Sequence, residues 1–277
     1  MSDLDAAFGN RGNRDATIVN LHGRGTIDGT KPSGPVGPGH AGDPFLIGEG
    51  MTGGYGKGAD ILHDCTISVE QGQIAVIVGP NGAGKSTAMK AIFGMLNLRK
   101  GSVRLNGRDI TALNPQDRVK AGMGFVPQVN NIFPSMTVEE NLEMGAFIRK
   151  DDIRRTMEQV YELFPAVAAK RRQAAGELSG GQRQQVAVGR ALMTQPSVLM
   201  LDEPTAGVSP IVMDELFDRI IAIARGGLPV LMVEQNAKQA MMIADKAYVL
   251  VQGANAHTGT GHELMQNDEV RRTFLGG

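Results

Sequence analysis

The stretch "VIVGPNGAGKSTAMKAIFG" (76–94) decides the fold. It joins an apolar, strand-like run to a segment whose apolar residues have helical spacing, and the pattern GxxxxGK[S/T] stands between them. In isolation such a loop would be an ordinary glycine-rich turn with an exposed lysine. A strand before it and a helix after it are the context in which this pattern binds nucleotide phosphates. The stretch therefore predicts a phosphate-binding loop.

Each residue type in this loop has a chemical reason to be there. Gly82 and Gly84 permit backbone geometries that a side chain would obstruct, so successive N–H groups can surround an anion at the positive end of a helix. Lys85 supplies charge for the β- and γ-phosphates, and Ser86 supplies a hydroxyl for Mg²⁺. The predicted ATP-binding loop comprises Gly79, Pro80, Asn81, Gly82, Ala83, Gly84, Lys85, Ser86 and Thr87.

A pair of carboxylates follows a second apolar run, "VLMLDEP" (198–204). Parallel strands deliver their last residues to one edge of the sheet, where the ligand of an open α/β sheet binds. Asp202 can then reach the Mg²⁺ shell, while Glu203 orients and deprotonates the water that attacks the γ-phosphate. Alone, the two residues would more often form a solvated turn. Together with the phosphate loop they predict a hydrolytic site.

The rest of the chain has the pattern of an α/β protein. Continuous apolar runs, typical of a parallel sheet buried on both faces, are "QIAVIVG" (73–79), "SVLMLDEP" (197–204) and "LPVLMVEQN" (228–236). Shorter, partly alternating runs predict an antiparallel layer: "FLIGEG" (45–50), "CTISVEQGQ" (65–73) and "GSVRLNGRDI" (101–110). We expect a P-loop NTPase fold with a RecA-like parallel core, an antiparallel β subdomain and a helical subdomain at about 130–180.

Two helices are predicted within that helical subdomain. "TVEENLEMGAFI" (137–148) begins with a capping box of Thr137 and Glu140. "DDIRRTMEQVYELFP" (151–165) has one apolar face, and we expect Pro165 to end it. The residues of that face are Ile153, Met157, Val160, Tyr161 and Phe164.

Composition excludes several classes of protein. Among 277 residues the formal net charge is -1, without the long basic run that nucleic acid or an anionic membrane would attract. A single cysteine, Cys65, excludes an intrachain disulfide framework and fits a reducing compartment. No apolar run approaches the roughly 18 residues of a membrane helix. Residues 1–44 are rich in Gly, Pro and Asp and predict a flexible tail, and we expect a cytoplasmic protein.

A second glycine motif, "LSGGQRQQVAVGRALM" (178–193), places a serine and two glycines before a helix. Ser179 is a good N-cap, and the free N–H groups after it offer a second anion site, although simple helix capping is the common explanation. With "GPNGAGKST", Gln128 in "GFVPQ" and "VLMLDEP", the stretch "LSGGQ" resembles the motif set of the ATP-binding cassette (ABC) superfamily. The resemblance covers about residues 45–277, with a C-terminal extension from about 254.

The resemblance implies further roles. Two cassettes of this family pair head to tail, so the signature of one faces the nucleotide of the other; its residues here are Ser179, Gly180, Gly181 and Gln182. Tyr55 matches the aromatic residue that stacks on adenine, although a lone Tyr in a glycine-rich loop is unremarkable. Gln128 would sense Mg²⁺ and the attacking water, where such a Gln is usually a surface residue. Residues 129–150 would contact a membrane permease.

Two positions depart from the usual family pattern. Gln235 stands where most members have His, and Pro210 stands where most have Asp. Both departures resemble one branch, the smaller ATPase of branched-chain amino acid importers and their urea or amide relatives, as does the end "GTGHELMQNDEVRRTFLGG" (259–277). Because Gln cannot titrate near neutral pH, Gln235 would position phosphate or water and leave the proton transfer to Glu203.

We therefore expect the ATPase subunit of an importer for branched-chain or other hydrophobic amino acids, with ATP and Mg²⁺ as cofactors. Its partners would be a second ATPase, either a sister subunit or a second copy, a membrane permease and, indirectly, a solute receptor, at the inner face of the cell membrane. Three alternatives remain: a urea or amide importer, a soluble ABC ATPase of DNA maintenance or translation, and a regulator without hydrolysis. The chain has neither sustained heptads nor a basic surface run, which argues against the ATPase of DNA maintenance or translation. The presence of Glu203 argues against the regulator without hydrolysis.

Overall fold

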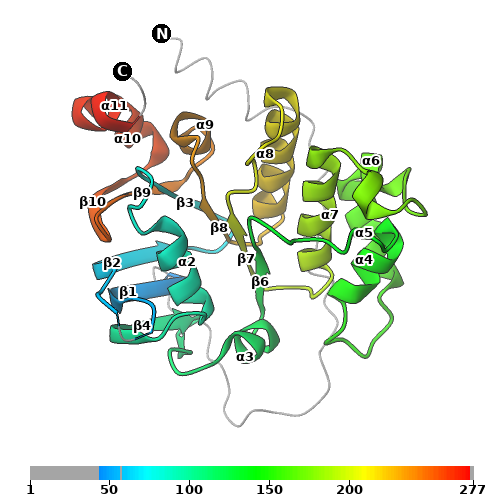
Figure 1. The fold of residues 1–277 in the computed structure, drawn as a ribbon, viewed down its shortest axis with the longest axis horizontal. Helices are drawn as coiled ribbons and strands as arrows, with labels where there is room; N and C mark the ends of the chain where they lie inside the picture. Colours follow the sequence, from blue (N-terminus) through cyan, green and yellow to red (C-terminus); the bar gives the residue numbers. More distant parts are fainter. Residues whose placement is uncertain (1–43, 57, 275–277) are drawn as a thin grey trace.

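The computed structural model describes residues 44–56 and 58–274, which form two sheets flanked by helices (Figure 1). Apart from Pro44, the predicted N-terminal tail lies outside the described residues. The strands are β1 (Leu46–Gly53), β2 (Leu62–Val69), β3 (Ile74–Val78), β4 (Leu98–Leu105), β5 (Arg108–Asp109), β6 (Met123–Val126), β7 (Val198–Asp202), β8 (Val230–Val233), β9 (Lys246–Val251) and β10 (Ala254–Gly259). Among residues 44–56 and 58–274 there is no helix with the length and apolar character that crossing a bilayer demands.

The larger sheet has six strands in the order β10-β9-β3-β8-β7-β6. Its pairs from β9 to β6 are parallel, and β10 pairs with β9 in the antiparallel sense. Strands β3, β7 and β8 are buried along their whole length, which explains why they are continuously apolar rather than alternating. Their carboxyl ends lie along one edge of the sheet, where the predicted site residues follow.

The smaller sheet has the order β2-β1-β4-β5, and its pairs are antiparallel. Strand β2 also lies beside β10, where the amide of Asn255 bonds both backbone groups of Thr66, at 2.7 and 2.9 Å. The predicted combination of a parallel core and an antiparallel layer is therefore confirmed.

The helices of the described chain are α2 (Lys85–Phe93), α3 (Pro115–Lys120), α4 (Val138–Gly145), α5 (Arg154–Leu163), α6 (Pro165–Ala168), α7 (Gly180–Leu192), α8 (Pro210–Arg225), α9 (Ala237–Met241), α10 (Gly261–Gln266) and α11 (Asp268–Phe274), with a 3₁₀ turn η1 (Ala175–Glu177). Helices α4, α5 and α6 lie together beside α7, away from the smaller sheet (Figure 1).

The capping box predicted for α4 is present, since Thr137 and Glu140 bond each other's backbone N–H groups. The helix ends at Gly145, three residues before the predicted end. Helix α5 stops at Leu163, and Pro165 is the first residue of α6, a position that proline favours. The predicted apolar face of α5 packs against one core; its members are Ile153, Met157, Val160, Tyr161 and Phe164.

Two hydrophobic cores lie on opposite faces of the large sheet. Alternate residues of β3 divide between them: Val76 and Val78 pack with α7 and α8, whereas Ala75 and Ile77 pack with α2 and the smaller sheet. This division follows from the two-residue period of a strand. Helices α2 and α7 therefore lie on opposite sides of the sheet, and so do the phosphate loop and the signature motif that precede them.

Candidate active site

The phosphate loop connects the end of β3 to the start of α2. Gly79 must be glycine, because a Cβ there would lie 2.3 Å from the carbonyl oxygen of Leu250. Gly84, the N-cap of α2, has a left-handed φ of 94° and makes no side-chain capping bond. The first N–H groups of α2 thus lie at the positive end of a nine-residue helix and are not claimed by a capping side chain. This arrangement suits an anion.

Lys85 lies beneath this loop with only 6% of its surface exposed. Its Nζ donates to the carbonyl oxygens of Gly79, at 2.9 Å, and Pro80, at 3.1 Å. Burial lowers the pKa of Lys85, while the negative charges of Glu203 and Asp202 oppose that shift. The ammonium group is therefore held between the loop and the two carboxylates at the next strand end.

Ser86 and Asp202 meet across the edge of the sheet. The Ser86 hydroxyl donates to Oδ1 of Asp202 over 3.1 Å, although 116 residues separate them in the chain. Asp202 ends the buried strand β7, and burial raises its pKa against the opposing effects of Ser86, Lys90 and Lys85. Two hard oxygen donors thus lie next to each other beside the loop.

Gln128 and Glu203 are also in contact. Nε2 of Gln128, which follows β6, donates to Oε2 of Glu203 over 2.8 Å. Glu203 has a left-handed φ of 48°, which costs a non-glycine residue about 1 kcal/mol or more. Its N–H donates to the carbonyl oxygen of Val233 in β8, at 3.0 Å. The strained residue is thus attached to two neighbouring strand ends.

Gln235 follows the end of β8 at the same edge, and it is exposed. The residue before it, Glu234, was not predicted to have a role of its own. It is 2% exposed and accepts hydrogen bonds from Thr205 and from the N–H of Gln235. A carboxylate at the end of an otherwise apolar strand was the only sequence signal that could have indicated it.

The signature motif begins α7. Ser179 is the N-cap, and it forms a capping box with Gln182. Gly181 lies so close to α8 that a Cβ would stand 2.0 Å from Cγ1 of Val212. Gln182 Oε1 also accepts a hydrogen bond from Lys170, at 3.1 Å. Within one chain the signature and the phosphate loop lie on opposite sides of the large sheet, so the structure does not bring them together.

Asn131 links the segment after Gln128 to α7. Its Nδ2 donates to the carbonyl oxygen of Pro127, at 3.3 Å, and to Oε1 of Gln184, at 2.9 Å. Gln184 belongs to the signature helix and is 9% exposed. The loop that carries Gln128 is thus tied to the helix that carries Ser179.

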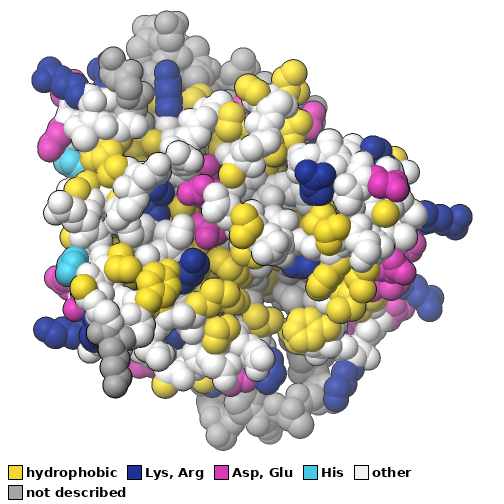
Figure 2. Space-filling model, in the orientation of Figure 1, with side chains coloured by type: hydrophobic (Ala, Val, Ile, Leu, Met, Phe, Trp, Pro, Cys, Tyr) yellow, Lys and Arg dark blue, Asp and Glu magenta, His cyan; other side chains and the backbone are white. Residues whose placement is uncertain are grey.

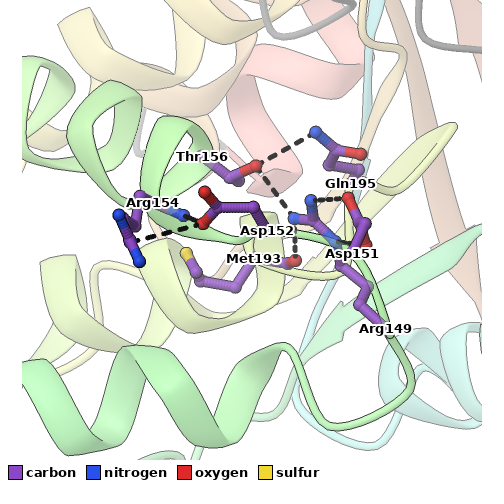
Figure 3. Close-up of polar contacts among 7 residues, drawn as sticks. All are labelled: Arg149, Asp151, Asp152, Arg154, Thr156, Met193 and Gln195. Atoms are coloured by element: carbon purple, nitrogen blue, oxygen red, sulfur yellow. Dashed lines mark hydrogen bonds and ion pairs between the residues drawn. The ribbon is translucent and has the colours of Figure 1, made fainter.

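The other end of α7 is held by the group of residues in Figure 3. Nη1 of Arg149 donates to the carbonyl oxygen of Met193, just after α7, at 3.0 Å, and to the hydroxyl of Thr156 at 2.8 Å. Gln195 donates to the same hydroxyl, and the remaining guanidinium nitrogens bond Asp151. These contacts join α5 and the segment before it to the end of the signature helix.

Tyr55 lies in the loop between β1 and β2, and 49% of its surface is exposed. Nζ of Lys90, from α2, lies 5.9 Å from the centre of the Tyr55 ring. Arg99 donates to the carbonyl oxygens of Gly56 and Gly58 in the same loop. The ring is therefore near the helix that follows the phosphate loop, and it is partly exposed.

Comparison with known proteins supports the nucleotide chemistry. The ABC transporter family model matches residues 62–206, which include the phosphate loop, Gln128, the signature and the carboxylate pair. The branched-chain amino acid transport ATP-binding protein BraG of Pseudomonas aeruginosa is 42% identical over 80% of this chain and 96% of its own. The probable branched-chain amino acid transport ATP-binding protein LivF of Archaeoglobus fulgidus is 41% identical over 82% of this chain and 96% of its own.

A lipopolysaccharide export ATP-binding protein, LptB of Escherichia coli K12, is 32% identical over 79% of this chain and 92% of its own. Among solved structures, an ATP-binding cassette of an ABC transporter in its ADP conformation superposes with a TM-score of 0.76 at 27% identity, covering 85% of this chain and all of that one. The family match spans more than half of the sequence, and the relatives span most of it. The chain belongs to the ABC transporter family as an ATP-binding cassette.

Proposed function

We propose that the chain hydrolyses ATP to energise uptake of branched-chain amino acids through a separate membrane permease. The observation that carries the proposal is the pairing of Ser86 with Asp202 and of Gln128 with Glu203 at one sheet edge. The similarity to BraG and LivF supports the choice of cargo. No residue of this chain would touch the cargo itself.

The phosphate loop and Lys85 would bind the phosphates of ATP, and Tyr55 would stack on the adenine ring. Ser86 and Asp202 present adjacent hydroxyl and carboxylate oxygens, a donor set that fits Mg²⁺, with Gln128 as a further oxygen donor. Bound Mg²⁺ neutralises charge on the phosphates. The role of the protein is to place these oxygens and the lysine at the same edge.

Glu203 would act as the general base that takes a proton from the attacking water. Gln128 holds one of its carboxylate oxygens, which orients the group. Gln235, from the neighbouring strand end, would hydrogen-bond the γ-phosphate or the water without taking the proton. This division leaves Glu203 as the single base among the proposed catalytic residues.

Completion of the site would require a second cassette. Because Ser179 lies across the sheet from the phosphate loop, head-to-tail pairing would bring the signature of one subunit to the nucleotide of the other. The capping box of α7 leaves further N–H groups of its first turn free for an anion. We propose a sister ATPase as the partner, with a second copy of this chain as the alternative.

The proposed permease contact is the segment 129–150 after Gln128. It exposes large apolar side chains to a degree unusual for a soluble surface; they are Val129, Phe133, Met144 and Phe147, the last 74% exposed. Figure 2 shows hydrophobic side chains gathered on the face where Figure 1 has the region between α2 and α4. Such a contact would hold the subunit at the cytoplasmic face of the membrane.

Transport measurements in cells lacking the gene test the proposal. Restoring the wild-type chain should restore uptake of labelled leucine, isoleucine and valine, whereas Lys85→Ala, which should not bind ATP, and Glu203→Gln, which should not hydrolyse it, should not. Phe147→Asp should abolish co-purification of the permease while ATP binding persists. Restored uptake of urea or a short amide, with amino acid uptake unchanged, would refute the amino acid cargo and support the related importers instead.

A further inference from the structure

We propose that Glu234 is a positioning residue for hydrolysis. It would fix the loop that follows Asp202 and Glu203 relative to the loop that begins at Gln235. The inference deepens the proposed function and rests on the roles given there to Glu203 and Gln235. Glu234 itself would touch neither nucleotide nor water. It would act through the residues that it holds.

The side chain of Glu234 has three donors around it. Oε1 accepts from the backbone N–H of Thr205, at 3.1 Å, and from the Thr205 hydroxyl, at 2.9 Å. Oε2 accepts from the N–H of Gln235, at 3.2 Å. Both carboxylate oxygens are therefore used, each toward a different loop of the site.

The backbone around Glu234 joins the same strand ends. Its N–H donates to the carbonyl oxygen of Ile77, two residues before Gly79, at 3.1 Å. The carbonyl oxygen of Val233, just before it, accepts the N–H of Glu203. One short segment thus contacts the ends of β3 and β7 as well as the start of the Gln235 loop.

Burial makes this carboxylate costly unless its hydrogen bonds are made. Glu234 is 2% exposed, and Thr205 is 7% exposed. A buried polar group that loses its partner gives up its full desolvation penalty, so the three hydrogen bonds act strongly to keep Thr205 and Gln235 in place. A hydrophobic side chain would fit an end of strand β8 without imposing any such geometry.

The hydrogen bonds between Glu234 and Thr205 would mainly serve to hold Glu203 in position. It has a left-handed φ, and its carbonyl oxygen accepts the N–H of Ala206 in a tight turn that contains Thr205. If Thr205 is released, the turn can relax and carry the Glu203 carboxylate away from its working position. Within residues 44–56 and 58–274, the hydrogen bonds of the Glu234 side chain go to Thr205 and Gln235 and none goes to the phosphate loop or Tyr55, so ATP affinity should be spared.

The experiment compares Glu234→Gln, Thr205→Val and the double variant, in the full-length chain within the complex that co-purifies with it. The amide keeps the size of Glu234 but can accept with one oxygen only, and valine removes the Thr205 hydroxyl while keeping its shape. We expect each single variant to lower kcat for ATP about tenfold, the size expected when one buried polar group loses its hydrogen-bond partner. KM for ATP should stay within about twofold, because binding groups are untouched.

Two results would distinguish an effect of these variants on the position of Glu203 from a general loss of stability. If Thr205 and Glu234 act through one contact, the double variant should be no slower than the worse single variant, because coupled sites are not additive. Thr205→Ser, which keeps the hydroxyl, should restore kcat, and it carries the test if Glu234→Gln fails to fold. The control is Thr111→Val, since the Thr111 hydroxyl also donates to an oxygen, the carbonyl of Val103 at 3.4 Å, in the smaller sheet away from the site; its kcat should be unchanged.

Several results would overturn the inference. They are unchanged kcat in both single variants, an additive double variant, or a rise in KM in place of the fall in kcat. Glu203→Gln, measured alongside, distinguishes a failure of the proposed catalytic roles from a failure of the positioning role of Glu234. If that variant hydrolyses ATP normally, the proposed catalytic roles fail; if it is inactive while Glu234→Gln and Thr205→Val are normal, only the role of Glu234 fails.

Discussion

Nε2 of Gln128 donates a hydrogen bond to Oε2 of Glu203 over 2.8 Å, although 75 residues separate them in the chain. The contact places the side chain that follows β6 against the proposed base that follows β7. Gln128 also begins the segment that Asn131 ties to the signature helix. A movement of that helix would therefore shift Gln128 and, through it, the side chain of Glu203. We propose this link as the route by which the position of a partner would affect hydrolysis.

Replacing Gln128 tests that link. Gln128→Ala should lower kcat about tenfold, since a hydrogen bond to a charged group contributes about 1.5–3 kcal/mol, while ATP affinity changes little. Gln128→Glu should be more severe, because a second negative charge would face Glu203. Steady-state ATPase assays check both, and a Gln128→Glu variant as active as wild type would contradict the contact's role.

Gln235 should be replaceable only by residues that hydrogen-bond. Gln235→Ala should lower kcat about tenfold or less, the loss expected for one hydrogen bond, and Gln235→His should be tolerated because imidazole offers a donor and an acceptor at similar reach. Comparison of kcat and KM for the two variants tests this. An alanine variant with normal turnover would reduce Gln235 to a residue that merely ends a strand.

Glu234 should make stability depend on pH. Burial is the largest cause that raises its pKa to about 7, with the Glu203 charge adding to it and the hydrogen bonds from Thr205 and Gln235 opposing it. Because the folded pKa lies above the unfolded value of 4.5, the folded state favours the protonated acid. The contribution of Glu234 to the unfolding free energy is therefore full below pH 4.5 and is lost as the pH rises to 7.

The variant Glu234→Gln stays neutral and lacks this dependence. The unfolding free energy of the variant, relative to wild type, should therefore rise between pH 4.5 and 7.5 by on the order of 3 kcal/mol, from about 1.4 kcal/mol per pKa unit. Urea unfolding of both proteins at a series of pH values measures the difference between their unfolding free energies. Because the other titratable groups are common to both proteins, their pH dependence cancels in this difference. A difference that is flat with pH, or that moves in favour of wild type as pH rises, would contradict the burial of an ionisable Glu234.

Arg118 should be a large single contributor to the stability of the phosphate-loop helix. It is 2% exposed and donates to the carbonyl oxygens of Ala91 and Ile92 at the end of α2, and to those of Leu113 and Thr111. Burial lowers the pKa of Arg118 to about 10, so it remains charged at neutral pH. Its positive charge also lies at the negative end of α2.

Arg118→Ala should lower the unfolding free energy by about 3–5 kcal/mol, because four carbonyl groups lose a buried donor. The matched control is Lys120→Ala on the same helix, whose exposed pair with Asp117 is worth at most about 1 kcal/mol. Denaturant unfolding measures both. Equal, small losses in the two variants would show that the buried guanidinium is not an anchor.

Much of the site edge could be predicted from the sequence, because its residues follow apolar strands directly. Ser86, Asp202, Glu203 and Gln235 each come within a few residues of a buried strand or the loop after it, and parallel strands end at one edge. The fold class followed from the same runs. Local capping at Thr137 and Ser179 also needs only short-range sequence.

Contacts that depend on distant packing could not be predicted. Arg118 reads as an ordinary charged residue on a short helix, yet it reaches carbonyl groups about 27 residues earlier in the chain. Asn131 finds Gln184 over 53 residues, and Glu234 finds Thr205 over 29. The sequence spacing contains no period or motif for such pairs, since they arise only when the sheet and the helices are assembled.

Glu203→Gln tests the central claim most directly, because it removes the base and keeps the shape of the side chain. If Glu203 deprotonates the attacking water, ATP turnover by the purified complex should fall by about 100-fold or more, while the Kd for ATP remains close to that of wild type. A Glu203→Gln complex that hydrolyses ATP at a near-normal rate would contradict the account.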